Sequence, residues 1–104
     1  MNGSINSTVA NADSRGMFIV NRTLSTHQDL YRNKVRIING VHNSIGIPNG
    51  DIYILCQNSG GPASYNTKQA SVAGLGGGLT QTNIDNLTDR IETYMDSNGR
   101  GVIP

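Results

Sequence analysis

A β-hairpin is indicated by the sequence His27-Gln-Asp-Leu-Tyr-Arg-Asn-Lys-Val-Arg-Ile-Ile-Asn39. Two short strand-like segments, 27–32 and 35–39, flank the dipeptide Asn33-Lys34. A two-residue turn between strands favours residues that accept positive φ, which Asn does readily and Lys does not. We therefore predict a β-hairpin in which Lys34 stands where Gly would fit better.

Three further segments have strand patterns. Residues 16–22, Gly-Met-Phe-Ile-Val-Asn-Arg, contain an unbroken apolar run of the kind found in strands buried on both faces. Residues 51–57, Asp-Ile-Tyr-Ile-Leu-Cys-Gln, give the clearest strand pattern, and residues 68–75 a weaker one. Loops are predicted between them at 40–50, which ends in the turn signal Asn49-Gly50, and at 58–67.

One helix is predicted, at residues 80–98. Apolar residues recur there at spacings of three and four, as in an amphipathic helix. Thr80 or Thr82 is a candidate N-cap, and Gly99 supplies a left-handed residue that ends the helix. The predicted apolar stripe consists of Ile84, Leu87, Ile91 and Tyr94 or Met95.

Four of the seven acidic residues share one face of this helix, within about 60° of each other and away from the apolar stripe. They are Asp85, Asp89, Glu92 and Asp96. One interpretation is a cation site or a docking face for a basic partner. We favour a solvated helix face, because carboxylates on one helix without an acidic loop rarely form a calcium site.

The composition favours a mainly β domain. The chain has 104 residues, of which 13 are Gly and 14% are charged, where about 25% is typical. It contains a single Glu, Glu92, which excludes a helical bundle, since bundles are rich in Glu, Lys and Leu. Short apolar runs in a chain that is 36% hydrophobic argue against disorder. We expect one domain at most.

Charge, cysteine content and hydropathy also restrict the partners. A net charge of +1 gives no field that attracts nucleic acid or an acidic membrane, so neither is expected as a partner. The single Cys56 excludes an internal disulfide framework and is interpreted as a small apolar strand residue. No signal-peptide pattern is present, and no apolar run approaches the roughly 18 residues of a membrane span. We expect a soluble chain without membrane insertion.

The order of these segments resembles a known family. The motifs are Gly16-Met-Phe-Ile-Val-Asn-Arg-Thr23, Leu30-Tyr-Arg-Asn-Lys34, Ile47-Pro-Asn-Gly-Asp-Ile-Tyr-Ile-Leu55, residues 68–74, and Gly78-Leu-Thr80 before a helix ending near Tyr94. In this order they resemble the concanavalin A-like lectin/glucanase jelly rolls. They are similar in particular to the laminin-G-like modules of bacteriophage tail and head-surface proteins and of bacterial surface proteins.

The resemblance covers residues 15–98 and matches the C-terminal half of such domains. It implies an antiparallel β-sandwich (jelly roll), or part of one, with a single C-terminal amphipathic helix. Residues 1–15 would be a flexible entry or edge strand, 16–98 the sandwich portion, and 99–104 a tail. Because such sandwiches commonly need about 200 residues, we expect completion by other protein chains, either a missing N-terminal half or identical subunits.

Catalysis is not supported by the residues present. The glucanases that the chain resembles use a pair of Glu flanking an Asp, since retaining hydrolysis needs two carboxyl groups about 5 Å apart. This chain has only Glu92. His27 and His42 have no nucleophile elbow nearby, so we interpret them as surface residues. We predict that the protein is not an enzyme and uses no cofactor and no metal.

The glycine-rich segment Gly74-Leu-Gly-Gly-Gly78 precedes the predicted helix, as in phosphate-binding loops. No Lys-Ser or Lys-Thr follows it, so the Walker pattern is absent. We interpret the segment as a close strand-to-helix crossing in which side chains do not fit.

Two groups of residues are candidates for ligand binding. Four basic residues gather around the hairpin tip, where they either bind phosphate or an acidic polysaccharide or protect the edge from aggregation; they are Arg22, Arg32, Lys34 and Arg36. The loop 57–67 combines an aromatic ring with amide side chains, which suits neutral sugars. The candidate binding residues are Arg32, Lys34, Asn58, Tyr65 and Asn66.

From this we expect a non-catalytic structural, receptor-binding or glycan-binding module of a bacteriophage virion, such as a tail fibre, head fibre or surface protein. Its location would be the virion or the extracellular cell surface. The sheet would be a rigid scaffold, and the loops 40–50 and 57–67 would contact other proteins or a cell-surface glycan. The alternatives are a C-terminal fragment of a secreted glycoside hydrolase and a bacterial surface lectin.

Overall fold

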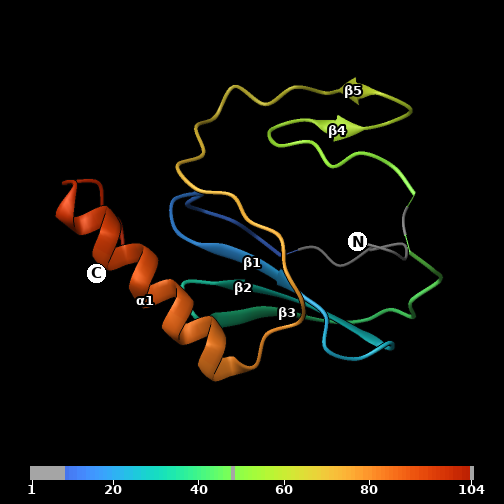
Figure 1. Cartoon of the computed structure of the whole chain (residues 1–104), viewed down its shortest axis with the longest axis horizontal. Coiled ribbons are helices and arrows are strands. Elements are labelled where there is room, and N and C mark those ends of the chain that lie inside the picture. Colours follow the sequence, from blue (N-terminus) through green and yellow to red (C-terminus); the bar gives the residue numbers. More distant parts are fainter. Residues whose placement is uncertain (1–8, 48, 104) are drawn as a thin grey trace. The chain divides into compact units, whose positions relative to one another are not determined.

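The computed structural model describes residues 9–47 and 49–103, which fall into two compact units (Figure 1). The larger unit contains residues 9–46 and 77–103, and the smaller contains the described part of 47–76. The predicted entry segment 1–15 is described only from Val9 onward, and residues 9–15 form no strand.

The larger unit is built on a three-stranded antiparallel sheet in the order β1-β2-β3. Its strands are β1, Phe18–Asn21; β2, His27–Arg32; and β3, Val35–Val41. The predicted strand at 16–22 and the predicted hairpin are therefore confirmed, although the first strand is shorter. The loop predicted from residue 40 begins later, because β3 continues to Val41.

The hairpin turn has the geometry expected from its length. Asn33 and Lys34 both have positive φ, at 48° and 75°. Positive φ at both central residues lets a two-residue turn match the twist of its strands. Lys34 adopts this conformation without the freedom of Gly, so other contacts have to hold it there.

The helix α1, Gln81–Ser97, lies within one residue of the predicted bounds at each end. Thr80 is the N-cap, and its side-chain oxygen accepts a hydrogen bond from the backbone N–H of Asn83 at 3.3 Å. Asn98 is the C-cap, and Gly99 follows with a φ of 65°. The helix thus begins after Thr80, one of the two predicted N-cap candidates, and ends just before the predicted left-handed Gly99.

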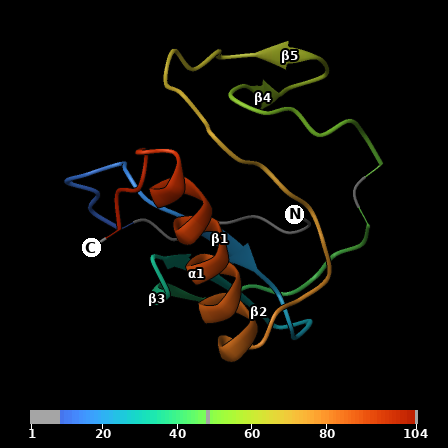
Figure 2. The same cartoon turned by 60° about the vertical axis from the view of Figure 1, so that its left-hand side comes forward.

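In the larger unit α1 lies across the three-stranded sheet (Figure 2). Tyr31 and Ile84 are the buried apolar residues among those described, and Thr88 is buried beside them on the helix. The predicted stripe is shifted, because Leu87 and Tyr94 are exposed. The helix face directed inward consists of Ile84, Thr88, Ile91 and Met95.

Only one face of β1 is covered. Asn21 is buried and Ile19 half-buried, whereas Phe18 and Val20, which point the other way, are 38% and 48% exposed. The prediction that this strand is buried on both faces is therefore wrong. Two residues of its apolar run, Phe18 and Val20, therefore remain exposed.

The chain enters α1 by passing close to the end of β1. A Cβ atom on Gly78 would lie 2.5 Å from the carbonyl oxygen of Arg22, so only Gly fits there. The side chain of Asn21 donates to the carbonyl of Leu79 and accepts its N–H, both at 2.8 Å. The predicted strand-to-helix crossing is therefore found only in part: Gly78 makes a close approach, but no strand immediately precedes it, and the other three glycines of this segment have open space where a Cβ would lie.

The smaller unit has little regular structure. Its strands β4, Gln57–Asn58, and β5, Pro62–Ala63, form a two-stranded antiparallel sheet. The strand predicted at 51–57 is wrong except for its last residue. Leu55 has a φ of 61°, which interrupts an extended backbone, and the apolar side chains before it are largely exposed.

The weaker strand predicted at 68–75 is also absent. Its small side chains are exposed and have no partner strand among the described residues. The described chain therefore combines a three-stranded and a two-stranded antiparallel sheet with one C-terminal helix, which is a mixed α and β architecture. No helix in the described part of the chain is long and apolar enough to cross a membrane.

Candidate functional site

The five candidate binding residues fall into two separate groups. Arg32 and Lys34 lie at the end of the β2–β3 hairpin in the larger unit. Asn58, Tyr65 and Asn66 lie in the smaller unit. The two groups therefore belong to different units.

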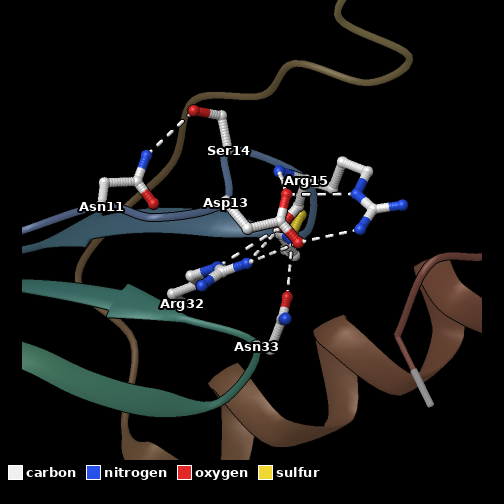
Figure 3. Close-up of polar contacts among 7 residues, drawn as sticks. Asn11, Asp13, Ser14, Arg15, Arg32 and Asn33 are labelled. Atoms are coloured by element: carbon white, nitrogen blue, oxygen red, sulfur yellow. Dashed lines mark hydrogen bonds and ion pairs between the residues drawn. The ribbon is translucent and has the colours of Figure 1, made fainter.

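Arg32 is the centre of a polar cluster with the segment that precedes β1 (Figure 3). Its guanidinium donates to the carbonyl oxygen of Arg15 from Nη2 at 2.9 Å and from Nε at 3.3 Å. Nη2 also lies 3.5 Å from the carboxylate of Asp13, and the guanidinium lies over the ring of Phe18, 5.7 Å from its centroid. A ligand at Arg32 would have to compete with these contacts.

Arg15 donates hydrogen bonds to the Asp13 carboxylate from both its side chain and its backbone N–H. The Arg15 side chain donates from Nε and Nη2, both at 3.1 Å, and the Arg15 backbone N–H donates at 3.0 Å. These hydrogen bonds, the side-chain ones first, lower the pKa of Asp13 below its ordinary value of 3.8, and the same pair raises the pKa of Arg15. Because both groups are exposed, water screens the pair and limits its stabilising effect.

Asn33 ties the hairpin turn to the start of β1. Its side-chain oxygen accepts the N–H of Met17 at 2.9 Å, and its own N–H donates to the Met17 carbonyl at 2.9 Å. Gly16, with a φ of 121°, lies against the Asn33 side chain, so a Cβ at position 16 would collide with it. The cluster is therefore organised by Asn33 as much as by Arg32.

Lys34 connects the same turn to α1. Its ammonium forms an ion pair with Asp89 at 2.5 Å, and its carbonyl oxygen accepts a hydrogen bond from Gln81 at 3.0 Å. Gln81 also donates to Asp85 at 2.8 Å. Two residues of the predicted acidic face thus take part in contacts within the chain.

The remaining basic residues of the hairpin region are also engaged. Arg22 Nη1 donates to the carbonyl oxygens of Ser25 and His42, at 3.0 and 2.9 Å. Arg36 Nη1 lies 3.9 Å from the carboxylate of Asp29. All four basic residues identified in the sequence therefore face acceptors of this chain.

In the loop 57–67 the aromatic residue and both amide residues, Asn58 and Asn66, are exposed. Tyr65 is 74% exposed. The side-chain N–H of Asn58 donates to the carbonyl of Asp51 at 2.6 Å, and the side-chain oxygen of Asn66 accepts the N–H of Lys68 at 2.8 Å. The amides shape the loop, and the Tyr65 ring presents the surface that a ligand would meet.

The other chemistry-bearing residues form no cluster in the described residues. Glu92 accepts the N–H of Ile103 at 2.7 Å, which folds the C-terminal tail back on α1. His27 and His42 are half-buried, where surface positions were expected, and Cys56 is half-buried too. No group of three His, Cys, Asp or Glu residues in the described ranges is placed to hold a metal ion.

Sequence reasoning missed Asn21, the buried residue that holds the entrance to α1. Its partner, Leu79, is 58 positions away in the sequence. An Asn that ends an apolar run resembles any other strand-terminating residue, so no local pattern indicated this role.

Comparison with protein-family models, curated proteins and solved structures finds no match to the chain.

Proposed function

We propose that this chain is a non-catalytic module of a protein assembly, of the kind that forms a bacteriophage virion or a bacterial surface structure. The supporting observation is an apolar face on the three-stranded sheet. Cross-strand pairing puts Phe18, Arg32 and Val35 in one row and Val20, Leu30 and Ile38 in the next. We call the five apolar members of these rows the sheet patch.

The sheet patch lies on the opposite face of β1 from Ile19 and Asn21. Phe18, Val20 and Val35 are exposed, and Leu30 and Ile38 are half-buried. The neighbouring row, Gln28 and Gly40, is buried, so the exposure is confined to the hairpin end. Contiguous apolar surface in a soluble protein marks an interaction site, since each Å² removed from water contributes about 25 cal/mol.

The proposed fold relationship gives this patch a role. In a concanavalin A-like jelly roll, a sheet packs face to face on a second sheet about 10 Å away. We propose that the described sheet is part of such a sandwich and that an identical subunit supplies the missing layer. The assembly would then belong to a virion or an extracellular surface, with protein as the principal partner.

Glycan binding is the second candidate function, and it rests on the exposed ring of Tyr65. Exposed aromatic faces stack on sugar rings, and the amides of Asn58 and Asn66 lie in the same loop, where they form hydrogen bonds with Asp51 and Lys68. No catalytic step forms part of the proposal, because the single Glu of the chain is bound to the tail through Ile103.

The proposal is tested by placing a charge on the sheet patch. Val20→Lys introduces it there, and Leu24→Lys is the matched control, because Leu24 is a 59% exposed residue outside the strands. Sedimentation velocity should show association of the wild-type chain and of Leu24→Lys, and dissociation of Val20→Lys, while far-ultraviolet circular dichroism stays the same. If all three chains sediment as monomers, the proposed assembly role is wrong.

A further inference from the structure

We propose that Asn49 is a site of spontaneous deamidation in the folded protein, and that the fold protects two other Asn-Gly sequences from the same reaction. The described residues contain three such pairs: Asn39-Gly40, Asn49-Gly50 and Asn98-Gly99. A fourth, Asn2-Gly3, lies outside the described residues. The three pairs differ in whether the backbone N–H of the glycine is held in a hydrogen bond.

Deamidation begins when the backbone nitrogen after an Asn loses its proton and attacks the side-chain amide carbon. A C–N bond forms, the bond to the side-chain nitrogen breaks, and ammonia leaves, giving a succinimide ring. Water then opens the ring to aspartate or isoaspartate. The reaction needs an amide N–H that is not held in a hydrogen bond and a backbone that rotates, and a following Gly presents no Cβ to hinder the attack.

The sheet protects Asn39. His42 donates its N–H to the carbonyl of Thr26 at 2.9 Å, which makes these two residues a hydrogen-bonded pair. Hydrogen-bonded pairs alternate along an antiparallel ladder, so Gly40 occupies the next such position, opposite Gln28. Gly40 is also buried. Attack by its nitrogen would require local opening of β2 from β3.

The helix cap protects Asn98. The N–H of Gly99 donates to the carbonyl of Asp96 at 2.9 Å. The side-chain amide of Asn98 donates to the carbonyl of Tyr94 at 2.8 Å, which holds it away from the Gly99 nitrogen. Both the nucleophile and the electrophile are therefore fixed by the end of α1.

Asn49 and Gly50 are exposed and lie outside every strand and helix. Among the described contacts, none holds the N–H of Gly50. Conversion of Asn49 would replace a neutral amide by a carboxylate and change the net charge of the chain from +1 to 0. The change would fall in the loop 40–50, which the sequence indicates as a contact loop.

The test is peptide mapping by mass spectrometry after incubation of the full folded chain in mildly alkaline buffer. Asn49 should convert roughly tenfold or more faster than Asn39 and Asn98, because reaction at the protected sites requires local unfolding. The same incubation in concentrated urea should bring the three rates together, since all three are Asn-Gly sequences.

Gly50→Ala is the matched variant. A Cβ at this position meets only the Asn58 side chain at 3.6 Å, an ordinary contact, so the substitution should fold and slow the reaction at Asn49 alone. Equal rates at the three sites in the folded chain, or an unchanged Asn49 in a chain whose Asn39 or Asn98 converts, would overturn the proposal.

Discussion

Lys34 in the β2–β3 turn forms an ion pair with Asp89 on α1, across 55 positions of sequence. The residue that fits its turn least well is therefore the one that contacts the helix. Its carbonyl oxygen is also bound by Gln81 at the start of α1. The hairpin and the helix, which sequence patterns predict separately, are joined at this residue.

The Lys34–Asp89 pair should make a small contribution to the free energy of unfolding, and this contribution should depend on the salt concentration. In a double-mutant cycle with Lys34→Met and Asp89→Asn, we expect a coupling free energy of about 0.5 kcal/mol, because the two side chains are 38% and 61% exposed. Urea unfolding at low and high salt measures it. The coupling should vanish at high salt, and strictly additive effects at low salt would contradict the pairing.

Substitution of the two turn residues by Gly should change the stability of the fold in opposite directions. In an Asp89→Asn background, Lys34→Gly should stabilise the fold by on the order of 1 kcal/mol, because it removes the cost of a left-handed Lys. Asn33→Gly should destabilise it, because the side-chain oxygen that accepts the Met17 N–H is lost. Thermal and urea unfolding compare the two. If both variants change the free energy of unfolding in the same direction, the turn is misassigned.

Among the polar residues of the larger unit, Asn21 should be the one whose substitution lowers the free energy of unfolding most. Asn21→Ala leaves the N–H and the carbonyl of Leu79 without their partners, at a cost of about 2–3 kcal/mol. Asn39→Ala, at an exposed strand position, is the control and should change stability by less than about 0.5 kcal/mol. Urea unfolding gives both values. Hydrogen exchange at Leu79 should accelerate only in the Asn21 variant, and equal effects of the two substitutions would refute the role of Asn21.

The pKa of Asp13 should lie below 3.8 in the folded chain, because Arg15 donates to its carboxylate. A group whose pKa is lower in the folded state stabilises that state above its unfolded pKa. This contribution is lost as the pH falls through the folded pKa. Carbon-detected NMR titration of the Asp13 carboxyl measures the value. Arg15→Gln should bring it back toward 3.8, and an unchanged titration would contradict the contact.

Two elements were predictable because their signals are local. The hairpin follows from a two-residue turn between strand-like segments, and α1 follows from its spacing and from the caps Thr80 and Gly99. The glycine at position 78 was likewise predictable as a close approach, since a Gly before a helix often marks one. In the hairpin and the helix the determining residues are neighbours in the sequence, whereas the residue that Gly78 approaches, Arg22, is remote.

The rest depends on contacts that no local pattern specifies. Residues 51–57 alternate as a strand does, but β-propensity acts through packing on neighbouring strands, and none pairs with residues 51–56 in the described chain. The cluster around Arg32 needs the segment 13–16 to return to the end of β2. The basic hairpin tip therefore looked like a binding surface in the sequence, whereas its side chains contact the chain itself.

We propose that this chain works as part of an assembly and not alone. Native mass spectrometry of the full wild-type chain over a range of concentrations tests it most directly. We predict masses of two or more chains, with a population that rises with concentration. A single-chain mass at every concentration, together with cooperative unfolding of that monomer, would show that the chain folds and works alone.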